Sequence, residues 1–328
     1  MKKFIHCLLC LLAISPFFGW NPMARAQADY PNRPIKVILP FPAGGPGDNA
    51  FRILGREMSP RLGQVLVFEN HVGGTGIIGQ DLASRSPPDG YTLVALTISG
   101  ALAYQGVGRT VDYARDFAMI GQIYSQYGLL VVNPEVPEMA AIRTLRDLIV
   151  YAKANPGKIN YASQGTGSVG HLVMEDIKAR TGIDVVHVPY RGVAPAYNDL
   201  LAGHIQMMSS SLGALPYIRA GKLRAIAIGS PQRSPLLPDV LTFIEQGLPG
   251  FVAGSWVGIA APPGTPPRNV NRLSAELQAA LSKPEVVELI RNLGTEPDYI
   301  PAAEFAARAN RDIARWGKIM RDNNIKPE

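Results

Sequence analysis

The stretch Phe41-Pro42-Ala43-Gly44-Gly45-Pro46-Gly47-Asp48 separates two segments of different periodicity. The short apolar run before it, Ile35–Leu39, is typical of a buried strand, and residues 49–58 after it have apolar side chains at helical spacing. Glycines leave backbone N–H groups accessible, and a helix N-terminus carries partial positive charge, so such a turn is suited to hold an anion. A tight turn with Asp48 as the helix N-cap explains the same residues without a ligand.

The same order of elements recurs further along the chain. A second strand is predicted at Gln64–Glu69, a second glycine-rich turn at Asn70–Gly79 and a third strand at Tyr91–Ile98. Strands that alternate with turns and helices indicate a parallel sheet covered by helices. Two more strands are expected at Phe117–Ile123 and Leu129–Val132, after which Asn133-Pro134 marks a crossing between domains.

A second α/β unit follows this crossing. It begins with a strand at Lys158–Ala162, the glycine-serine turn Ser163–Ser168 and a helix at Val169–Arg180. The strand Trp256–Ala261 is predicted to return the chain to the first sheet, and the tail after it is predicted to be helical. We therefore expect an α/β protein of two doubly wound domains joined by a hinge, with domain 1 formed by residues 27–132 plus 255–328 and domain 2 by residues 133–254.

The N-terminus has the pattern of a secretory signal peptide. Lys2 and Lys3 precede a short apolar run, and Ala24-Arg25-Ala26 matches a small-x-small cleavage site, so residues 1–26 are assigned to the signal. Both cysteines lie within it, which excludes disulfides and cysteine metal sites from the mature chain. Removal of its three cations lowers the formal net charge from +6 to +3, and no basic cluster suited to nucleic acid remains. No later segment is apolar enough to insert stably in a membrane.

Two stretches, residues 74–79 and 165–170, match the dinucleotide pattern G-x-G-x-x-G. The pattern also requires an acidic residue at the end of the next strand, to bind the ribose. Neither following strand ends in one, so no nicotinamide or flavin cofactor is expected. The histidines have no metal-ligand spacing either, and no metal is predicted.

Ser168 and His171 suggest a hydrolase as an alternative function. The sequence Thr166-Gly167-Ser168-Val169-Gly170 departs from G-x-S-x-G at its first position, and His171 lies one turn along the same predicted helix. That geometry is poor for a base acting on Ser168. We prefer the interpretation that Ser163, Thr166 and Ser168 offer hydroxyl and N–H groups to a ligand.

Each domain is thus predicted to place a polar turn at the carboxyl end of its parallel strands, where open α/β sheets bind ligands. Opposed across a hinge, the two turns would form a clamshell. Arg191 follows a predicted strand and could pair with a carboxylate in the cleft. An exported protein of this clamshell shape, without a predicted metal site, thiol or catalytic group of side chains, suggests capture of a small anionic solute.

Several ordered motifs resemble one family. The residues that carry the resemblance begin with Tyr30-Pro31-Asn32-Arg33-Pro34-Ile35 and Pro40-Phe41-Pro42-Ala43-Gly44-Gly45 with Asp48, and continue with Pro88-Asp89-Gly90-Tyr91-Thr92-Leu93, Asn160-Tyr161-Ala162-Ser163, Gly165, Gly167, His171-Leu172, Val188-Pro189-Tyr190, Ala220-Gly221-Lys222-Leu223-Arg224-Ala225 and Ala261-Pro262-Pro263-Gly264-Thr265-Pro266. They are similar to the substrate-binding proteins of tripartite tricarboxylate transporters, also called Bug receptors. The likeness covers nearly the whole mature chain.

The resemblance implies a periplasmic-binding-protein-like fold, a location in the periplasm, and delivery of a small carboxylate to separate membrane transporter subunits. Nothing in the sequence points away from a monomer. In the family, the first loop and the first turn of domain 2 grip a carboxylate through N–H groups and waters. The ligand-binding residues expected here, including those inferred above, are Phe41, Ala43, Gly44, Gly45, Asp48, Ser163, Gln164, Gly165, Thr166, Gly167, Ser168, His171, Arg191 and Ser209.

Ser209 departs from the family pattern, in which an aspartate often follows the residues that match Met207-Met208. Without that carboxylate, a ligand ammonium group lacks an acceptor, so an amino acid is disfavoured relative to a dicarboxylate, tricarboxylate or aromatic acid. A receptor that presents its closed form to a sensor protein is the remaining alternative to a transport role.

Overall fold

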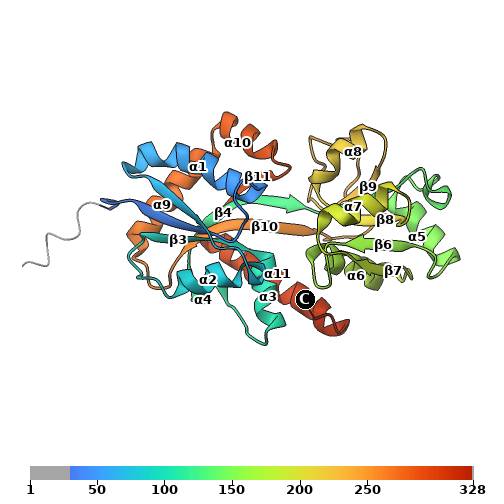
Figure 1. Cartoon of the computed structure of the whole chain (residues 1–328), viewed down its shortest axis with the longest axis horizontal. Helices are drawn as coiled ribbons and strands as arrows, with labels where there is room; N and C mark the ends of the chain where they lie inside the picture. Colours follow the sequence, from blue (N-terminus) through green and yellow to red (C-terminus); the bar gives the residue numbers. More distant parts are fainter. Residues whose placement is uncertain (1–29, 327–328) are drawn as a thin grey trace, which may run out of the picture.

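The computed structural model describes residues 30–326, so the predicted signal peptide lies outside the described residues. Two α/β domains lie end to end along the longest axis of the molecule, each built on its own sheet (Figure 1). This arrangement confirms the predicted fold class of two hinged α/β domains.

The first sheet has six strands in the order β11-β4-β10-β3-β1-β2. β1 pairs parallel with β2 and β3, whereas β10 runs antiparallel to β3 and β4, and β11 antiparallel to β4. The sheet is therefore mixed, with its parallel part on one side. Its strands are β1 (Ile35–Leu39), β2 (Leu66–Asn70), β3 (Thr92–Thr97), β4 (Ala118–Tyr127), β10 (Gly254–Ala261) and β11 (Glu296–Pro301).

Alternate residues of this sheet face two hydrophobic clusters. Ile35, Val37 and Leu39 pack with residues of α1, α9 and α10, while Ile38 packs with residues of α2, α3 and α11. The sheet is thus covered on both faces, as its continuous apolar strands predict. The helices are α1 (Pro46–Leu62), α2 (Ile77–Ser84), α3 (Ile98–Gly106), α4 (Tyr113–Asp116), α9 (Pro267–Leu281), α10 (Pro284–Arg291) and α11 (Ala302–Asp322), with a 3-10 turn η2 at Gly74–Gly76.

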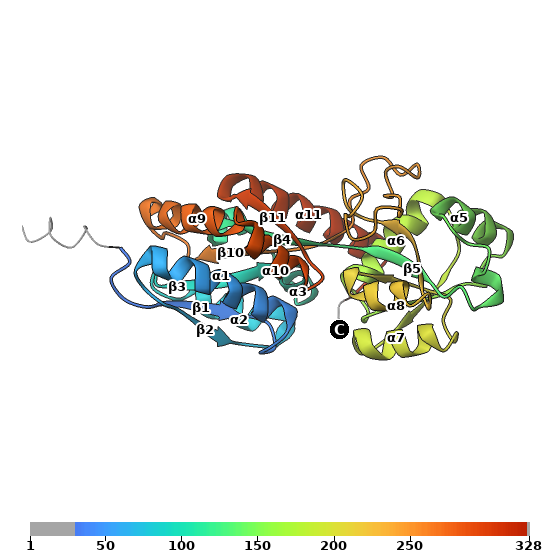
Figure 2. The ribbon, with the colours of Figure 1, turned by 90° about the horizontal axis from the view of Figure 1, so that it is seen from above.

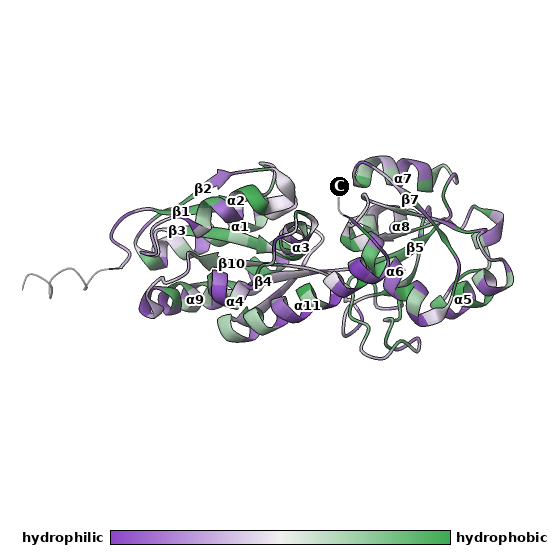
Figure 3. Ribbon diagram, turned by 90° about the horizontal axis from the view of Figure 1, so that it is seen from below, coloured by the Kyte–Doolittle hydropathy of each residue, from purple (hydrophilic) through white to green (hydrophobic). Residues whose placement is uncertain are grey.

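The second sheet has five strands in the order β7-β6-β8-β5-β9. β6 is parallel to β7 and β8, and β5 is antiparallel to β8 and β9. Its strands are β5 (Leu129–Val132), β6 (Asn160–Ser163), β7 (Val186–Pro189), β8 (Met207–Ser210) and β9 (Arg224–Ile228). Its helices are α5 (Leu145–Ala154), α6 (Val169–Thr181), α7 (Val193–Leu201) and α8 (Leu215–Arg219), with 3-10 turns η3 (Pro137–Met139) and η4 (Leu212–Ala214). In both domains apolar residues are concentrated where helices meet the sheets (Figure 3).

Three backbone segments meet where the chain crosses between the domains. Only Gly128 separates β4 from β5, and the chain returns at Ala253 into β10. The N–H of Gly128 donates to the Ala253 carbonyl at 2.8 Å, Gly229 N–H donates to the Gly128 carbonyl at 2.7 Å, and Ala253 N–H donates to the Gly229 carbonyl at 2.9 Å. We call Gly128, Gly229 and Ala253 the crossing triad; it is the structural counterpart of the predicted hinge.

The structure corrects three details of the sequence interpretation. Leu129–Val132 pairs with β8 and β9, so sheet membership places the first crossing at Gly128 and not after Val132. Residues 98–100, predicted as the end of the third strand, instead begin α3, whose first turn is capped by the Thr97 hydroxyl accepting from Gly100 N–H at 3.0 Å. Residues 296–301, within the predicted helical tail, form the edge strand β11.

The predicted return strand is confirmed, because β10 lies between β3 and β4. Trp256 on this strand is 1% exposed and packs edge-on against Tyr113 and Phe305, with ring centroids 6.0 and 5.0 Å away. Its indole N–H donates to Asp312 at 3.0 Å. Trp256 is therefore part of the core of domain 1.

α11 provides a further connection between the domains. It packs along domain 1 and its C-terminal half reaches the base of domain 2 (Figure 2). Arg315 on this helix donates to Asp176 of α6 at 2.6 Å and to the Val252 carbonyl at 2.6 Å. The side chain of Asp176 is 10% exposed, so this ion pair is shielded from water.

Candidate functional site

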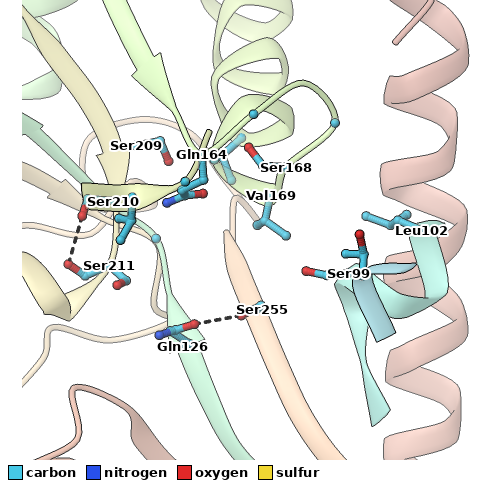
Figure 4. A pocket seen from close by; sticks show the side chains of 18 of the residues that line it. Ser99, Leu102, Gln126, Gln164, Ser168, Val169, Ser209, Ser210, Ser211 and Ser255 are labelled. Atoms are coloured by element: carbon cyan, nitrogen blue, oxygen red, sulfur yellow. Dashed lines mark hydrogen bonds between the residues drawn. The ribbon is translucent and has the colours of Figure 1, made fainter. Parts of the chain in front are cut away.

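A pocket of about 590 Å³ lies between the domains beside the crossing. Strand ends from both sheets surround it, as the topology of open α/β sheets predicts. In domain 2 these are the carboxyl ends of β6, β7 and β8; in domain 1 they are the ends of β3 and β4 and the start of β10 (Figure 4). Seven predicted residues line the pocket: Gln164, Gly165, Thr166, Gly167, Ser168, Arg191 and Ser209.

The turn after β6 forms the domain 2 wall. Gly165 and Gly167 have φ of 130° and 77°, which favour glycine. Ser168 caps α6, its hydroxyl accepting from His171 N–H at 3.4 Å. A Cβ at Gly170 would lie 2.9 Å from the Ser209 carbonyl oxygen, so a glycine is required where α6 crosses the end of β8. The turn and the serines after β8 are consequently held side by side.

Ser163 and His171 lie behind this turn and are absent from the pocket lining. Ser163 is fully buried, its hydroxyl lies 2.7 Å from His187 Nε2, and it accepts from Gly165 N–H at 3.2 Å. His171 is 6% exposed and its Nδ1 accepts from Gly167 N–H at 3.1 Å. Both side chains therefore shape the turn from beneath, and a direct ligand contact for either stays a prediction.

Domain 1 contributes residues that the sequence analysis did not select. Ser99, the second residue of α3, and Leu102 one turn later face Ser168 and Val169 across the pocket (Figure 4). Gln126 at the end of β4 contributes to the floor, as do Thr75 and Ser255 elsewhere in domain 1. The sequence signal for this wall is the cluster of small polar residues after the third strand, although such residues also suit the end of a strand.

The first glycine-rich loop follows β1 at the same edge of the sheet but is absent from the pocket lining. Its tip is exposed, while Asp48 is 1% exposed. The Asp48 carboxylate accepts from Gly44 N–H at 2.9 Å, Arg52 Nε at 2.8 Å and Asn70 Nδ2 at 2.9 Å. The predicted ligand role of the loop, assigned to Phe41, Ala43, Gly44, Gly45 and Asp48, therefore stays untested, and Asp48 organises the loop internally.

The suggestion that Asp48 is the N-cap of α1 is wrong. Gly45 occupies the cap position and Pro46 the first turn, and Asp48 reaches back from the third helical position. Its bond with the Arg52 guanidinium, assisted by Asn70 and the Gly44 N–H, lowers the pKa of the Asp48 carboxyl to about 2.

Replacing Asp48 by asparagine is expected to lower the free energy of unfolding by about 2 kcal/mol near neutral pH, because charge-assisted hydrogen bonds to a buried carboxylate are lost. The folded-state pKa of about 2 lies below the ordinary value of 3.8, so this stabilisation is complete above the ordinary value and is lost as pH falls through about 2. Urea unfolding across this range should show a steeper loss for the wild type than for the variant. Asp184→Asn, at an exposed position, is the control; equal slopes in wild type and Asp48→Asn would contradict the assignment.

The electrostatics of the pocket favour an anion. Arg191 is the one charged side chain among the described residues that line it, and none of those residues is acidic. The N-termini of α3, α6 and α7 open on the pocket, represented in its lining by Ser99, Val169 and Val193. Each N-terminus carries N–H groups that have no partner within the helix, together with partial positive charge.

The geometry does not supply a base to Ser168. The His171 ring engages Gly167 N–H through Nδ1, and only the His171 backbone contacts the Ser168 hydroxyl. Beneath the turn, Ser163 is buried and pairs with the half-buried His187. Across residues 30–326, no group of acidic, histidine or cysteine side chains has the arrangement of a metal site, and no helix has the length and hydropathy to cross a bilayer.

Two α/β domains with a pocket at the crossing between them have the architecture of the periplasmic-binding-protein class. The family described as "Tripartite tricarboxylate transporter family receptor" (TctC) matches residues 50–325. The chain belongs to this family, as the sequence motifs predicted.

Relatives support this assignment over most of the chain. BugT of Bordetella pertussis is 35% identical over 308 residues, which cover 92% of this chain and 93% of BugT. An R. palustris protein solved with adipate is 31% identical with a TM-score of 0.74, covering 92% of this chain and 100% of that one. MatC from Rhodopseudomonas palustris, solved with bound malate, is 29% identical with a TM-score of 0.69, covering 88% and 99%.

Proposed function

We propose that this protein captures a small carboxylate in the periplasm and, as a monomer, delivers it to the membrane subunits of a tripartite tricarboxylate transporter. The observation that carries the proposal is the pocket itself: three helix N-termini and one arginine converge on it, and its described lining is free of carboxylates. A bound anion would meet favourable partial charges from both domains at once.

The proposed mechanism is closure of one domain on the other. A ligand that contacts both walls binds the closed arrangement more tightly than the open one and shifts the population toward it. The crossing triad provides the place where the backbone can flex. Its short connections favour rotation of the domains over sliding.

The lining also narrows the ligand class. Leu102, Val169 and Val173 give the pocket an apolar side that suits a hydrocarbon chain or ring. Ser209 leaves no carboxylate to receive an ammonium group. Relatives solved with adipate and malate support a dicarboxylate as the first ligand to test.

A dicarboxylate at about a hundred times its dissociation constant is expected to raise the free energy of unfolding by about 2.7 kcal/mol, because it binds only the folded protein. Thermal unfolding should be followed with adipate, malate, citrate and benzoate, and the responders confirmed by titration calorimetry. The diol and diamine of the same chain length as adipate serve as controls. Stabilisation by the diamine, or by none of the acids after a denaturing wash to remove bound ligand, would count against the proposal.

A further inference from the structure

We propose that His171 and His187 are a positioning pair that holds the turn Ser163–Ser168 in its binding shape, and that the pair does so only while the His171 ring is neutral. The proposal rests on the ligand-binding role proposed for that turn. Neither residue lines the pocket, so the pair acts on the ligand through the turn and not by contact.

The two rings form a continuous stack beneath the turn. Their centroids are 3.8 Å apart and their planes differ by 13°. The Tyr161 ring continues the stack, 4.9 Å from His187 at 25°. The pair therefore joins β6, β7 and α6, which are the elements that begin and end around the turn.

Each ring holds one part of the turn. His187 Nε2 lies 2.7 Å from the Ser163 hydroxyl, and that hydroxyl donates to the Gly165 carbonyl at 3.0 Å and accepts from Gly165 N–H at 3.2 Å. His171 Nδ1 accepts directly from Gly167 N–H. Two glycines with positive φ, the most adaptable points of the turn, are thus held by the two imidazoles.

This arrangement requires a particular tautomer of His171. Because Gly167 N–H is a donor, Nδ1 must be unprotonated and the proton must lie on Nε2, which is 3.9 Å from Glu175 Oε1. If Nδ1 were protonated, its N–H would face the Gly167 N–H, and the hydrogen bond between them would be lost. Protonation of both rings would in addition place two cations 3.8 Å apart.

The surroundings favour the neutral forms. The titratable groups around the pair are Tyr161 on β6 and Glu175 and Lys178 on α6; Glu175 already accepts from the Tyr161 hydroxyl at 2.7 Å and from Lys178 at 2.8 Å. Burial lowers the pKa of His171, and burial together with His171 lowers the pKa of His187 to about 4. Depressed folded-state values mean that the stabilisation is complete above the ordinary histidine pKa of 6.5 and is lost as pH falls toward about 4.

The first test is NMR of the ring nitrogens in the ligand-free mature chain, which does not depend on knowing the ligand. We expect both rings to be neutral near pH 6.5, with His171 protonated on Nε2, and both to titrate below the ordinary histidine value of 6.5. A charged His171 ring near neutral pH, or a His171 proton on Nδ1, would overturn the proposal.

The second test measures adipate affinity between about pH 7.5 and pH 4. His171→Asn retains an acceptor near Nδ1 and His187→Gln retains a polar atom near Nε2, and neither titrates. At neutral pH both should bind adipate within about threefold of the wild type, while His171→Leu and His187→Leu should bind at least about tenfold more weakly. Below its pKa, a ring that must be neutral has to lose a proton before the turn can bind the ligand. Each such deprotonation lowers the affinity of the wild type for adipate by up to about tenfold per pH unit.

The double variant His171→Asn/His187→Gln should lack this extra pH dependence, whereas the control His204→Asn should keep it; His204 is exposed and lies outside the pocket. Titration of adipate itself is common to all variants and cancels in the comparison. A double variant with the wild-type profile, or amide variants as weak as the leucine variants, would refute the proposal. If the wild type binds no carboxylate at any pH, the proposed function fails while the NMR result still decides the state of the pair.

Discussion

Replacing Gly229 by alanine is expected to lower the free energy of unfolding by about 3 kcal/mol or more, the upper part of the range for overpacked sites. A Cβ there would lie 2.2 Å from the Ala253 carbonyl oxygen and 2.9 Å from the Ala253 Cβ. The oxygen belongs to the backbone, so no side-chain rotation relieves the contact. The Ala253 segment would have to move, breaking the hydrogen bonds that close the crossing triad.

Gly128→Ala is the matched control because it alters the same triad. A Cβ at Gly128 would lie 3.4 Å from the same oxygen, which is ordinary van der Waals contact. Urea unfolding of both variants should show a large loss for Gly229→Ala and a small one for Gly128→Ala. Similar losses in the two variants would show that steric fit at the triad is not what requires a glycine.

Replacing Arg191 by glutamate is expected to weaken binding of a dicarboxylate by at least about a hundredfold, equivalent to about 2.7 kcal/mol. Arg191 is the one charged side chain among the described lining residues, so its reversal changes the sign of the side-chain charge around the ligand. Like charges brought together in an interface cost several kcal/mol. Arg191→Gln, which removes the charge without reversing it, should weaken binding by about tenfold.

Titration calorimetry at low and high salt distinguishes a loss of affinity caused by charge repulsion from one caused by the altered shape of the side chain. The loss in Arg191→Glu should shrink as salt screens the repulsion. Arg219→Glu is the control, since Arg219 is exposed on the same domain outside the pocket lining. Equal weakening in Arg191→Glu and Arg219→Glu would show that only the net charge of the domain matters, and unchanged affinity in Arg191→Glu would place the anion elsewhere.

Most of the architecture was predictable because its units are local. A strand, a glycine-rich turn and a helix leave their periodicities in adjacent residues, and the return of the chain at Trp256 was visible as an apolar strand between turn signals. α3 was missed because Ser99 and Gly100 resemble a strand end, although Thr97 caps them into a helix. β11 was missed because an edge strand of six residues is specified by its pairing with β4.

The site was predictable on one side of the pocket only. The turn after β6 lines the pocket as expected, since β6 and β8 both end there in small polar residues. The domain 1 wall depends on how α3 and the end of β4 face domain 2, which is a tertiary property. Ser163 is absent from the pocket lining, and its hydroxyl contacts His187 instead. This contact likewise depends on tertiary structure, because His187 lies 24 positions away in the sequence.

The position of β10 has a consequence for the order in which the protein folds. β10 lies between β3 and β4 in the first sheet, yet it is synthesised after the whole of domain 2. An emerging chain that ends before residue 254 therefore leaves β3 and β4 with unpaired facing edges, while residues 129–253 already include every strand of the second sheet. We expect domain 2 to fold first and domain 1 to be completed last, so a chain truncated before residue 254 would have a folded domain 2 attached to an incomplete, aggregation-prone domain 1.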